Sequence, residues 1–145
     1  MSKSHSLVLV LIALSILSIS ALAESNYTVN LTADKFLGSY LVNQSGFALY
    51  YFSQDRDAAG GSACYDDCAA LWPAFYAGDD LSLPESLRSS DFASIVRTDG
   101  SKQTSYRGWP LYLYSEDHAE GDTNGQGEQD GLWNIISPDD VPQMI

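Results

Sequence analysis

Two similar ten-residue stretches decide the fold of this chain: GFALYYFSQD at residues 46–55 and GWPLYLYSED at residues 108–117. The second copy starts 62 positions after the first (108 minus 46), and five of the ten positions are identical. A Leu-Trp pair follows each copy, at residues 71–72 and 132–133. Two copies are too few for a solenoid, so the repeat predicts a pseudo-symmetric domain whose halves pack against each other.

Each copy is typical of a β-strand, because aromatic and large apolar residues fill it, a glycine opens it and an aspartate closes it. Alternate side chains of a strand point to opposite faces, and here both faces are apolar. We therefore expect two central strands that are covered on both sides. Pro110 has no N–H to donate, which predicts an edge or a bulge at the start of the second strand.

Further strands and short helices are predicted around these copies. Additional strands are predicted at residues 36–42, 93–98, 102–106 and 131–136, with a hairpin turn at Asp99-Gly100. Helical segments are predicted at residues 63–71, capped by Ser62, and at residues 81–87. The predicted fold class is mainly β with one or two short helices, with α+β as the alternative, in a pseudo-symmetric domain from a duplicated β unit.

The N-terminal residues 1–23 predict a secretory signal peptide. A short basic start precedes an apolar run, and Ala21-Leu22-Ala23 has the small-x-small pattern that signal peptidase accepts. The alternative is an uncleaved membrane anchor, for which the apolar run is close to the lower limit of roughly 18 residues. We expect a secreted or cell-surface protein, without membrane insertion after cleavage and without a lipid, since no cysteine lies near the cleavage site.

The remaining chain is expected to form one domain with flanking segments. Residues 24–35 are predicted to be an exposed N-terminal segment, residues 36–137 a single domain, and residues 138–145 a C-terminal tail. The two repeat units within the domain are placed at about residues 39–76 and 101–137.

The mature chain is strongly acidic. Cleavage removes one of the 7 Lys+Arg residues and leaves 6 against 19 Asp+Glu, a formal net charge of −13 (6 minus 19). Such a surface repels nucleic acid and anionic lipid, so neither is an expected partner. The expected partner is an unidentified extracellular or cell-envelope ligand.

Three N-glycosylation sequons occur within 20 residues, and their asparagines are Asn26, Asn30 and Asn43. In an exported chain this spacing predicts a glycosylated, solvent-facing segment. The alternative is a host that does not glycosylate them.

The two cysteines, Cys64 and Cys68, predict one disulfide in an exported protein. Closing so short a loop stabilises by about 2 kcal/mol in the chain-entropy description. A redox role is disfavoured because Asp66 and Asp67 between the cysteines raise the pKa of a thiol, and a metal role because no other Cys or His is near.

The glycine-rich loop after residue 120 is the candidate cation site. It places oxygen-bearing side chains at the first, third, fifth and ninth positions of a calcium-loop pattern, in the order Asp122, Asn124, Gln126 and Asp130. Trp133 stands at the twelfth position, where a bidentate glutamate is expected, and Asp117 is a further candidate ligand. The alternative, which we favour, is a connection whose glycines supply positive φ. No cofactor is therefore predicted, with Ca²⁺ as the candidate should one bind.

The repeated aromatic and acidic residues have two interpretations. They are Tyr50, Phe52, Asp55, Tyr112, Tyr114 and Asp117. The aromatic rings form either a platform for a sugar, peptide or planar ligand or, as alternation favours, part of the core. The aspartates either cap the following turns or pair as cation ligands. No catalytic residue is predicted, because His118 is the one histidine left after cleavage and no nucleophile motif accompanies it.

These residues resemble a known family of secreted bacterial and archaeal repeats, described as predicted lipoproteins with a Tyr-x-(Phe/Trp/Tyr)-x-x-Asp motif. The motif matches residues 50–55 and 112–117, and the resemblance extends over about residues 40–136. It implies export, a cell-envelope setting and repeat-built domains, but supplies no activity or catalytic residues. We therefore expect a secreted or cell-surface, non-catalytic binding or structural domain. The alternatives are a cation-dependent extracellular module and, behind it, a carboxylate-dependent extracellular hydrolase.

Overall fold

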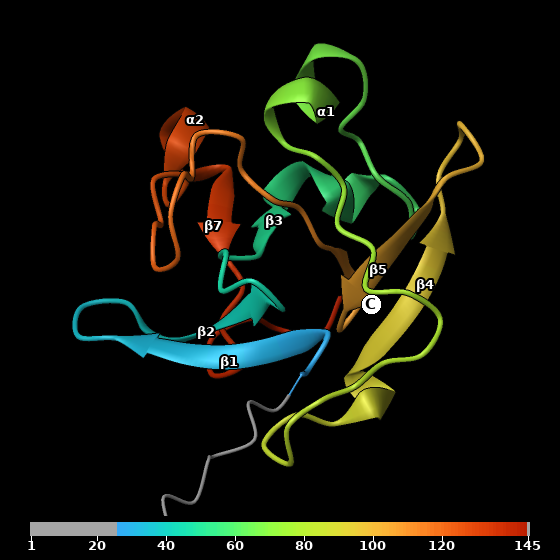
Figure 1. Ribbon diagram of the computed structural model, residues 1–145. Helices are drawn as coiled ribbons and strands as arrows, with labels where there is room; N and C mark the ends of the chain where they lie inside the picture. The colour runs from blue at the N-terminus through green and yellow to red at the C-terminus, as the bar shows by residue number, and fades with distance from the viewer. Residues whose placement is uncertain (1–25, 145) are drawn as a thin grey trace, which may run out of the picture.

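The computed structural model describes residues 26–144 and is mainly β, as predicted (Figure 1). Its strands form three small antiparallel sheets. They are the hairpin β1 (Val29–Asp34) and β2 (Gly38–Asn43), the pair β3 (Tyr50–Phe52) and β7 (Trp133–Ile135), and the sheet β4 (Phe92–Val96), β5 (Lys102–Tyr106) and β6 (Trp109–Pro110). The predicted signal peptide lies outside the described residues.

Short helical turns connect these strands. The 3₁₀ turns are η1 (Ser53–Asp57) and η2 (Ser89–Asp91), and the α-helical turns are α1 (Asp67–Leu71) and α2 (Glu128–Gly131). No helix within residues 26–144 is long and apolar enough to cross a bilayer.

Strand β1 lies within residues 24–35, the segment that was expected to be exposed; Asn26 and residues 33–35 are exposed, and residues 27–28 and 30–32 are half-buried. Val29 is fully buried, and the strand pairs with β2 from Val29↔Asn43 to Asp34↔Gly38. The alternation of Val29, Leu31 and Ala33 is the pattern of a half-buried strand. Val29 is buried and Leu31 packs against the core, whereas Ala33 near the hairpin end is exposed. The Asn30 and Thr32 side chains between them lie on the other face.

The helix predictions were partly wrong. The helix expected at residues 63–71 starts only at Asp67, because Asp66 has a φ of +52° and Ser62 bonds to Tyr112 rather than capping a helix. The segment 81–87 contains turns and no helix. Its N–H groups bond within a turn, as from Leu87 to the carbonyl of Pro84.

The two repeat units exchange strands across the centre of the molecule. Strand β7, from the second unit, pairs with β3 of the first, so that Ile135 faces Tyr50. Ala74, from the first unit, pairs in the same way with Tyr112 of the second. Tyr50 and Tyr112 then join the units directly, because each donates its N–H to the other's carbonyl at 2.9 Å. Each half is thus completed by the other, and the duplicated unit makes one domain.

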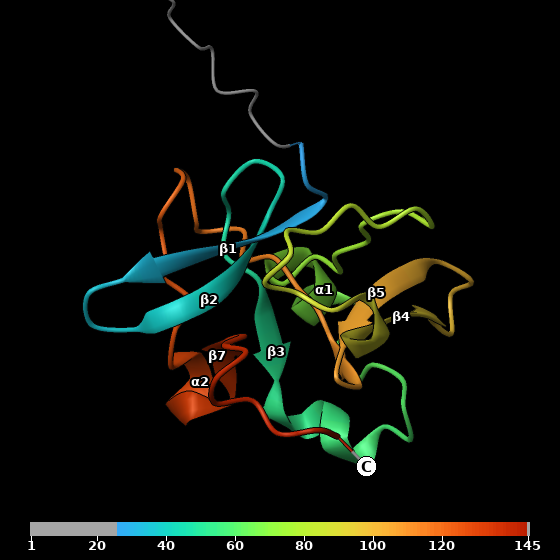
Figure 2. The same ribbon diagram turned by 90° about the horizontal axis from the view of Figure 1, so that it is seen from below.

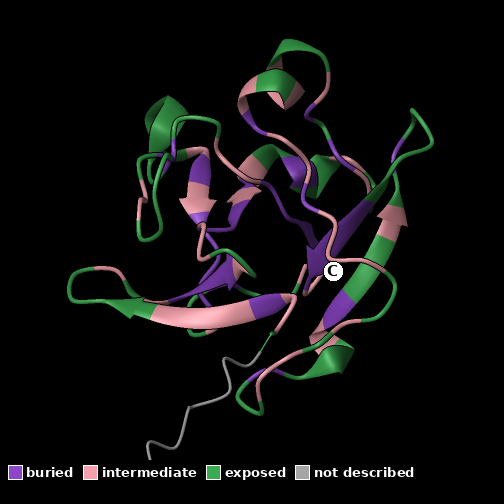
Figure 3. Ribbon diagram, viewed as in Figure 1, coloured by how far each residue is buried: buried purple, intermediate pink, exposed green. Residues whose placement is uncertain are grey.

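The core follows this exchange. In Figure 3 the buried residues concentrate in β3, β5 and β7 at the centre, and the hairpin ends are exposed. One core cluster is mainly aliphatic and runs under β1, β2 and β5, and the other is mainly aromatic and surrounds β3 and β7. The aromatic cluster contains the repeated aromatic motif residues, so the candidate site lies around it.

Candidate functional site

The motif tyrosine of each copy is hydrogen-bonded to the motif aspartate of the other copy. The Tyr50 hydroxyl donates to Asp117 Oδ2 at 2.7 Å, and the Tyr112 hydroxyl donates to Asp55 Oδ2 at 2.7 Å. The other oxygen of each carboxylate accepts a backbone N–H. Asp117 Oδ1 accepts the Asn124 N–H at 2.9 Å, and Asp55 Oδ1 accepts the Ala63 N–H at 2.8 Å. The motif spacing therefore encodes a reciprocal bond between the two halves.

Burial shifts the pKa of these groups. Desolvation raises the pKa of Asp55 to about 6, although the Ala63 N–H, the Tyr112 hydroxyl and the charge of Arg97 all act to lower it. Desolvation also raises the pKa of Asp117, against the Tyr50 hydroxyl and the Asn124 N–H. The two carboxyl groups are thus buried, engaged by fixed donors and easier to protonate than an exposed aspartate.

Four aromatic rings stack in a column between the halves. Its order is Phe52, Trp133, Trp72 and Tyr114, with centroid distances of 4.3, 3.9 and 4.2 Å. The two central tryptophans come from different repeat units and are parallel within 1°. Tyr50 and Tyr112 meet the column edge-on, at 5.4 Å from Trp72 and 5.0 Å from Trp133. Phe52 is buried, whereas Tyr114 at the other end is only half-buried and reaches the surface.

The loop at residues 122–130 braces this column. Gly125 lies so close to it that a Cβ there would stand 2.6 Å from the Trp72 ring. Asp122 Oδ2 accepts the N–H groups of His118 and Ala119, both at 2.9 Å. Gln126 Oε1 accepts the Ile135 N–H at 2.7 Å. Asn124 Nδ2 donates to the carbonyl of Glu116 at 3.1 Å, and Asp130 is exposed. Asp122, Asn124 and Gln126 are therefore each bonded to a different part of the protein.

A calcium site in this loop stays a prediction. Within residues 26–144 no group of three or more His, Cys, Asp or Glu side chains is placed to hold a metal ion. We expect the thermal midpoint of unfolding to be the same with calcium as with a chelator, because Asp122 and Gln126 already accept protein N–H groups. A midpoint that rises with calcium and not with magnesium would establish the cation-dependent alternative.

The Cys64–Cys68 disulfide is present, and it links Cys64, which precedes α1, to Cys68 within α1. The Cys64 carbonyl accepts a hydrogen bond from Arg97 Nη2, which ties this segment to the end of β4.

The three sequon asparagines, Asn26, Asn30 and Asn43, line one polar hollow beside β1 and β2. Their glycosylation stays a prediction.

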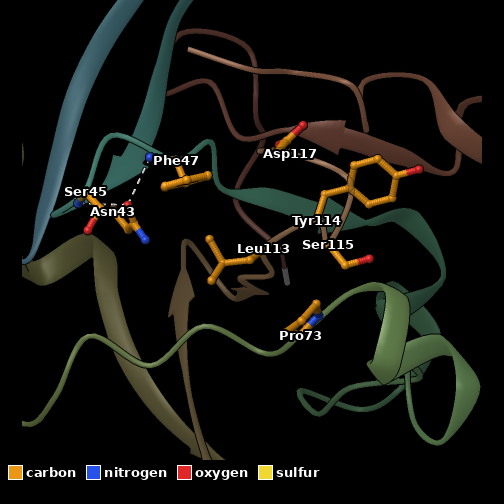
Figure 4. A pocket seen from close by; sticks show the side chains of 8 residues that line it. All are labelled: Asn43, Ser45, Phe47, Pro73, Leu113, Tyr114, Ser115 and Asp117. Carbon is orange, nitrogen blue, oxygen red and sulfur yellow. Dashed lines mark hydrogen bonds between the residues drawn. The ribbon is translucent and has the colours of Figure 1, made fainter. Parts of the chain in front are cut away.

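A cleft of about 330 Å³ lies where Tyr114 reaches the surface (Figure 4). Phe47 enters it from the β2–β3 connection, Pro73 from the segment after α1, and Leu113 lies between them in Figure 4. The complete lining is Asn43, Ser45, Phe47, Pro73, Leu113, Tyr114, Ser115 and Asp117. The cleft thus joins an apolar floor to a polar margin and contains two predicted motif residues, Tyr114 and Asp117.

Sequence reasoning missed most of this cleft. Phe47 and Leu113 both belong to the repeated stretches, but they occupy different positions in the two copies. Only the strand exchange brings the start of one copy next to the end of the other. The duplication was the one signal in the sequence that could have indicated this cleft. Where two similar halves pack against each other, a residue of one copy contacts a residue at a different position of the other copy.

A family model described as a secreted repeat of unknown function matches the chain twice, at residues 31–76 and 93–136. The two matches cover more than half of the chain, and each includes one motif copy and one of the stacked tryptophans. Neither the comparison with curated proteins nor the comparison with solved structures gave a match.

Proposed function

Because the chain belongs to the family of secreted repeats of unknown function, we propose that it acts outside the cell as a non-catalytic binding domain. Its ligand site is the cleft lined by Phe47, Leu113 and Tyr114. The observation that carries the proposal is that the buried aromatic column opens to the surface at one end, Tyr114, inside this cleft. A half-exposed aromatic ring on a rigid base, with polar groups around it, is a common way to hold a ligand.

The carboxylates support binding rather than catalysis. Asp55 is fully buried, and each motif aspartate accepts two hydrogen bonds from the fold itself. Asp55 therefore joins the halves away from solvent, and Asp117, which lines the cleft, has both of its oxygens engaged by the fold. His118 is exposed and lies 3.8 Å from Glu116, with no nucleophile bonded to it. The polar edge of the cleft therefore serves recognition.

The proposal is tested by probing the fluorescently labelled secreted protein against an array of oligosaccharides and short peptides. Leu113→Glu places a charge on the apolar floor of the cleft and is expected to weaken retention on the binding spots by about tenfold or more. Val96→Glu is the matched control, because Val96 is 71% exposed on β4, away from the cleft. Both variants are first checked for an unchanged far-ultraviolet circular dichroism spectrum. Equal losses in the two variants, or none in either, would refute the cleft as the binding site.

A further inference from the structure

The cleft has a counterpart in the other half of the domain. The repeat offset of 62 pairs Phe47 with Trp109 and Leu113 with Tyr51. Tyr51 and Trp109 pack against each other, with ring centroids 4.9 Å apart. The two halves exchange strands in the same way, since Tyr50 pairs with Ile135 and Tyr112 pairs with Ala74. The pair Tyr51 and Trp109 therefore corresponds in position to the pair Leu113 and Phe47. The molecule therefore builds the same type of apolar floor twice.

The chain's own C-terminal tail, residues 138–144, covers this counterpart. Trp109 Nε1 donates to the carbonyl of Pro142 at 3.1 Å, and the Met144 N–H donates to the carbonyl of Arg107 at 2.8 Å. Val141 is only 5% exposed and joins the core. In Figure 2 the end of the tail lies beside the 3₁₀ turn that follows β3. One of the two floors thus already holds a proline-containing segment, which turns at residues 138–140 and continues without regular structure over residues 141–144.

The corresponding segment of the first half takes a different course. At the offset of 61 between the two tryptophans, residues 77–83 correspond to the tail. The Ala77 N–H donates to Thr104 Oγ1 at 2.9 Å, and the Ser82 carbonyl accepts the Thr28 N–H at 2.9 Å. These bonds hold the segment against β5 and the start of β1. It therefore leaves the floor at Phe47 open.

Two arginines lie at the margin of the floor that the C-terminal tail covers. Arg107 Nη1 donates to the carbonyls of Pro138 and Val141, at 2.7 and 3.2 Å. Arg56 lies on the same margin, beside Pro142. The tail in turn carries Asp139 and Asp140. Arg107 Nε also pairs with Asp91 at 3.6 Å, and both tail aspartates are exposed. The basic margin therefore lies beside an acidic segment and contacts it through backbone carbonyls.

The open cleft has lost this basic margin. Ser45 replaces Arg107, and His118 replaces Arg56 at the same offset. Asp117 lines the cleft, and Glu120 packs against Gly46 in the neighbouring polar hollow, where a Cβ on Gly46 would stand 2.5 Å from Glu120 Cγ. The charge next to the open floor is thus negative, in a chain whose net charge is also strongly negative.

We propose that the open cleft binds a proline-containing peptide segment of a secreted partner, with lysine or arginine where the tail has Asp139 and Asp140. The proposal rests on the binding function assigned to this cleft above. The Asn43 side chain accepts the Ser45 and Phe47 N–H groups at 3.0 Å through its oxygen. Its amide nitrogen faces the cleft in Figure 4 and donates to a peptide carbonyl, as Trp109 Nε1 does for the tail.

Two peptides with the sequence of residues 137–144 test the charge rule, one unaltered and one carrying Asp139→Lys and Asp140→Lys. They are titrated into ¹⁵N-labelled secreted protein from a host without N-glycosylation, so that Asn43 is unmodified. We expect the lysine peptide to bind about tenfold more tightly than the acidic peptide. Amide shift changes are expected at residues 45–47 and 113–117. Equal affinity for the two peptides, or shifts elsewhere, would overturn the proposal.

A charge-reversal variant makes the test independent of overall stability. Ser45→Arg restores the residue found at the covered floor, and Ser45 is exposed, so the fold tolerates it. The preference is expected to invert, with the acidic peptide now bound more tightly. Ser94→Arg adds the same charge on exposed β4 and is expected to leave the preference unchanged. A preference that both variants change alike would mean a general charge effect and would reject the site.

The two tests separate the proposals. Should neither peptide bind while an oligosaccharide is retained in a Leu113-dependent manner, the cleft is a binding site and the peptide inference fails. Should Leu113→Glu change no binding of any kind, the proposed function fails with it.

Discussion

Replacing Trp133 by alanine is expected to lower the free energy of unfolding by about 4 kcal/mol, within the range for large aromatic residues in cores. Trp133 is fully buried, stacks on Trp72 and Phe52 and receives the edge of Tyr112. Its loss opens a cavity at the centre of the column and removes stacking between the halves. Since domains are stable by only about 5–15 kcal/mol, the variant should be close to unfolding.

Guanidinium denaturation of the wild type and the variant measures this effect. Trp133→Phe keeps an aromatic ring in the column and should lose less than half as much. Phe36→Ala is the surface control, because Phe36 is 86% exposed at the tip of the β1–β2 hairpin and should change stability by less than about 0.5 kcal/mol. A Trp133→Ala loss below about 1 kcal/mol would show that the column does not join the halves.

Removal of the Tyr112 hydroxyl is expected to cost about 2 kcal/mol at neutral pH, the typical value for a buried hydrogen bond to a charged group. Tyr112→Phe leaves Asp55 Oδ2 and Ser62 Oγ without their shared partner. Tyr76→Phe is the matched control, because it removes a Tyr-Asp hydrogen bond to Asp79, whose side chain is 72% exposed. The control should lose less than about 0.5 kcal/mol, since solvent replaces the donor at Asp79.

The cost of Tyr112→Phe should depend on pH in a defined direction. The pKa of Asp55 is raised to about 6 in the folded protein, above its unfolded value of roughly 3.9. The folded state therefore binds more protons between these values, and the stability that Asp55 contributes is full below about pH 4 and lost as pH rises to about 6. Since the Tyr112 hydroxyl lowers this pKa, removing it raises the pKa further. The variant should lose more at pH 7 than at pH 5.

Denaturation at both pH values measures this difference, and Asp55→Asn, which cannot titrate, should abolish the dependence. The wild type itself should be more stable at pH 5 than at pH 7, by about 1 kcal/mol from Asp55 alone. A cost of Tyr112→Phe that is equal at the two pH values would contradict the assignment of the bond to a carboxylate.

Much of the architecture could be predicted from local pattern. Strands β4 and β5 lie within a residue or two of their predicted bounds, because alternation and the Asp99-Gly100 turn are short-range signals. The family is confirmed by two matches in the positions of the duplicated unit. Strand β1 was missed because the polar residues Asn30 and Thr32 alternate with Val29 and Leu31, and only tertiary packing buries one face of so short a pattern. The helix predicted at residues 63–71 begins only at Asp67, because the residue before it, Asp66, has a positive φ that the local pattern does not indicate.

The candidate site was predictable only in part. The motif residues were identified, and their repetition marked them as related. That Tyr50 bonds to Asp117 rather than to Asp55 could not be predicted, since both aspartates are equivalent in a repeat. The cleft depends on this exchange, because Phe47 and Leu113 meet only when the halves are interleaved.

The sequence by itself determined a secreted, acidic, duplicated β domain with one disulfide, because charge, local alternation and repetition are properties of short stretches. Only the tertiary structure decided that the two copies complete each other, that four rings stack between them, and that one of two equivalent floors is covered by the tail. A duplicated sequence specifies equal halves, and it is packing across their boundary that makes the halves different. The Arg107 of one margin and the Ser45 of the other show that difference most directly.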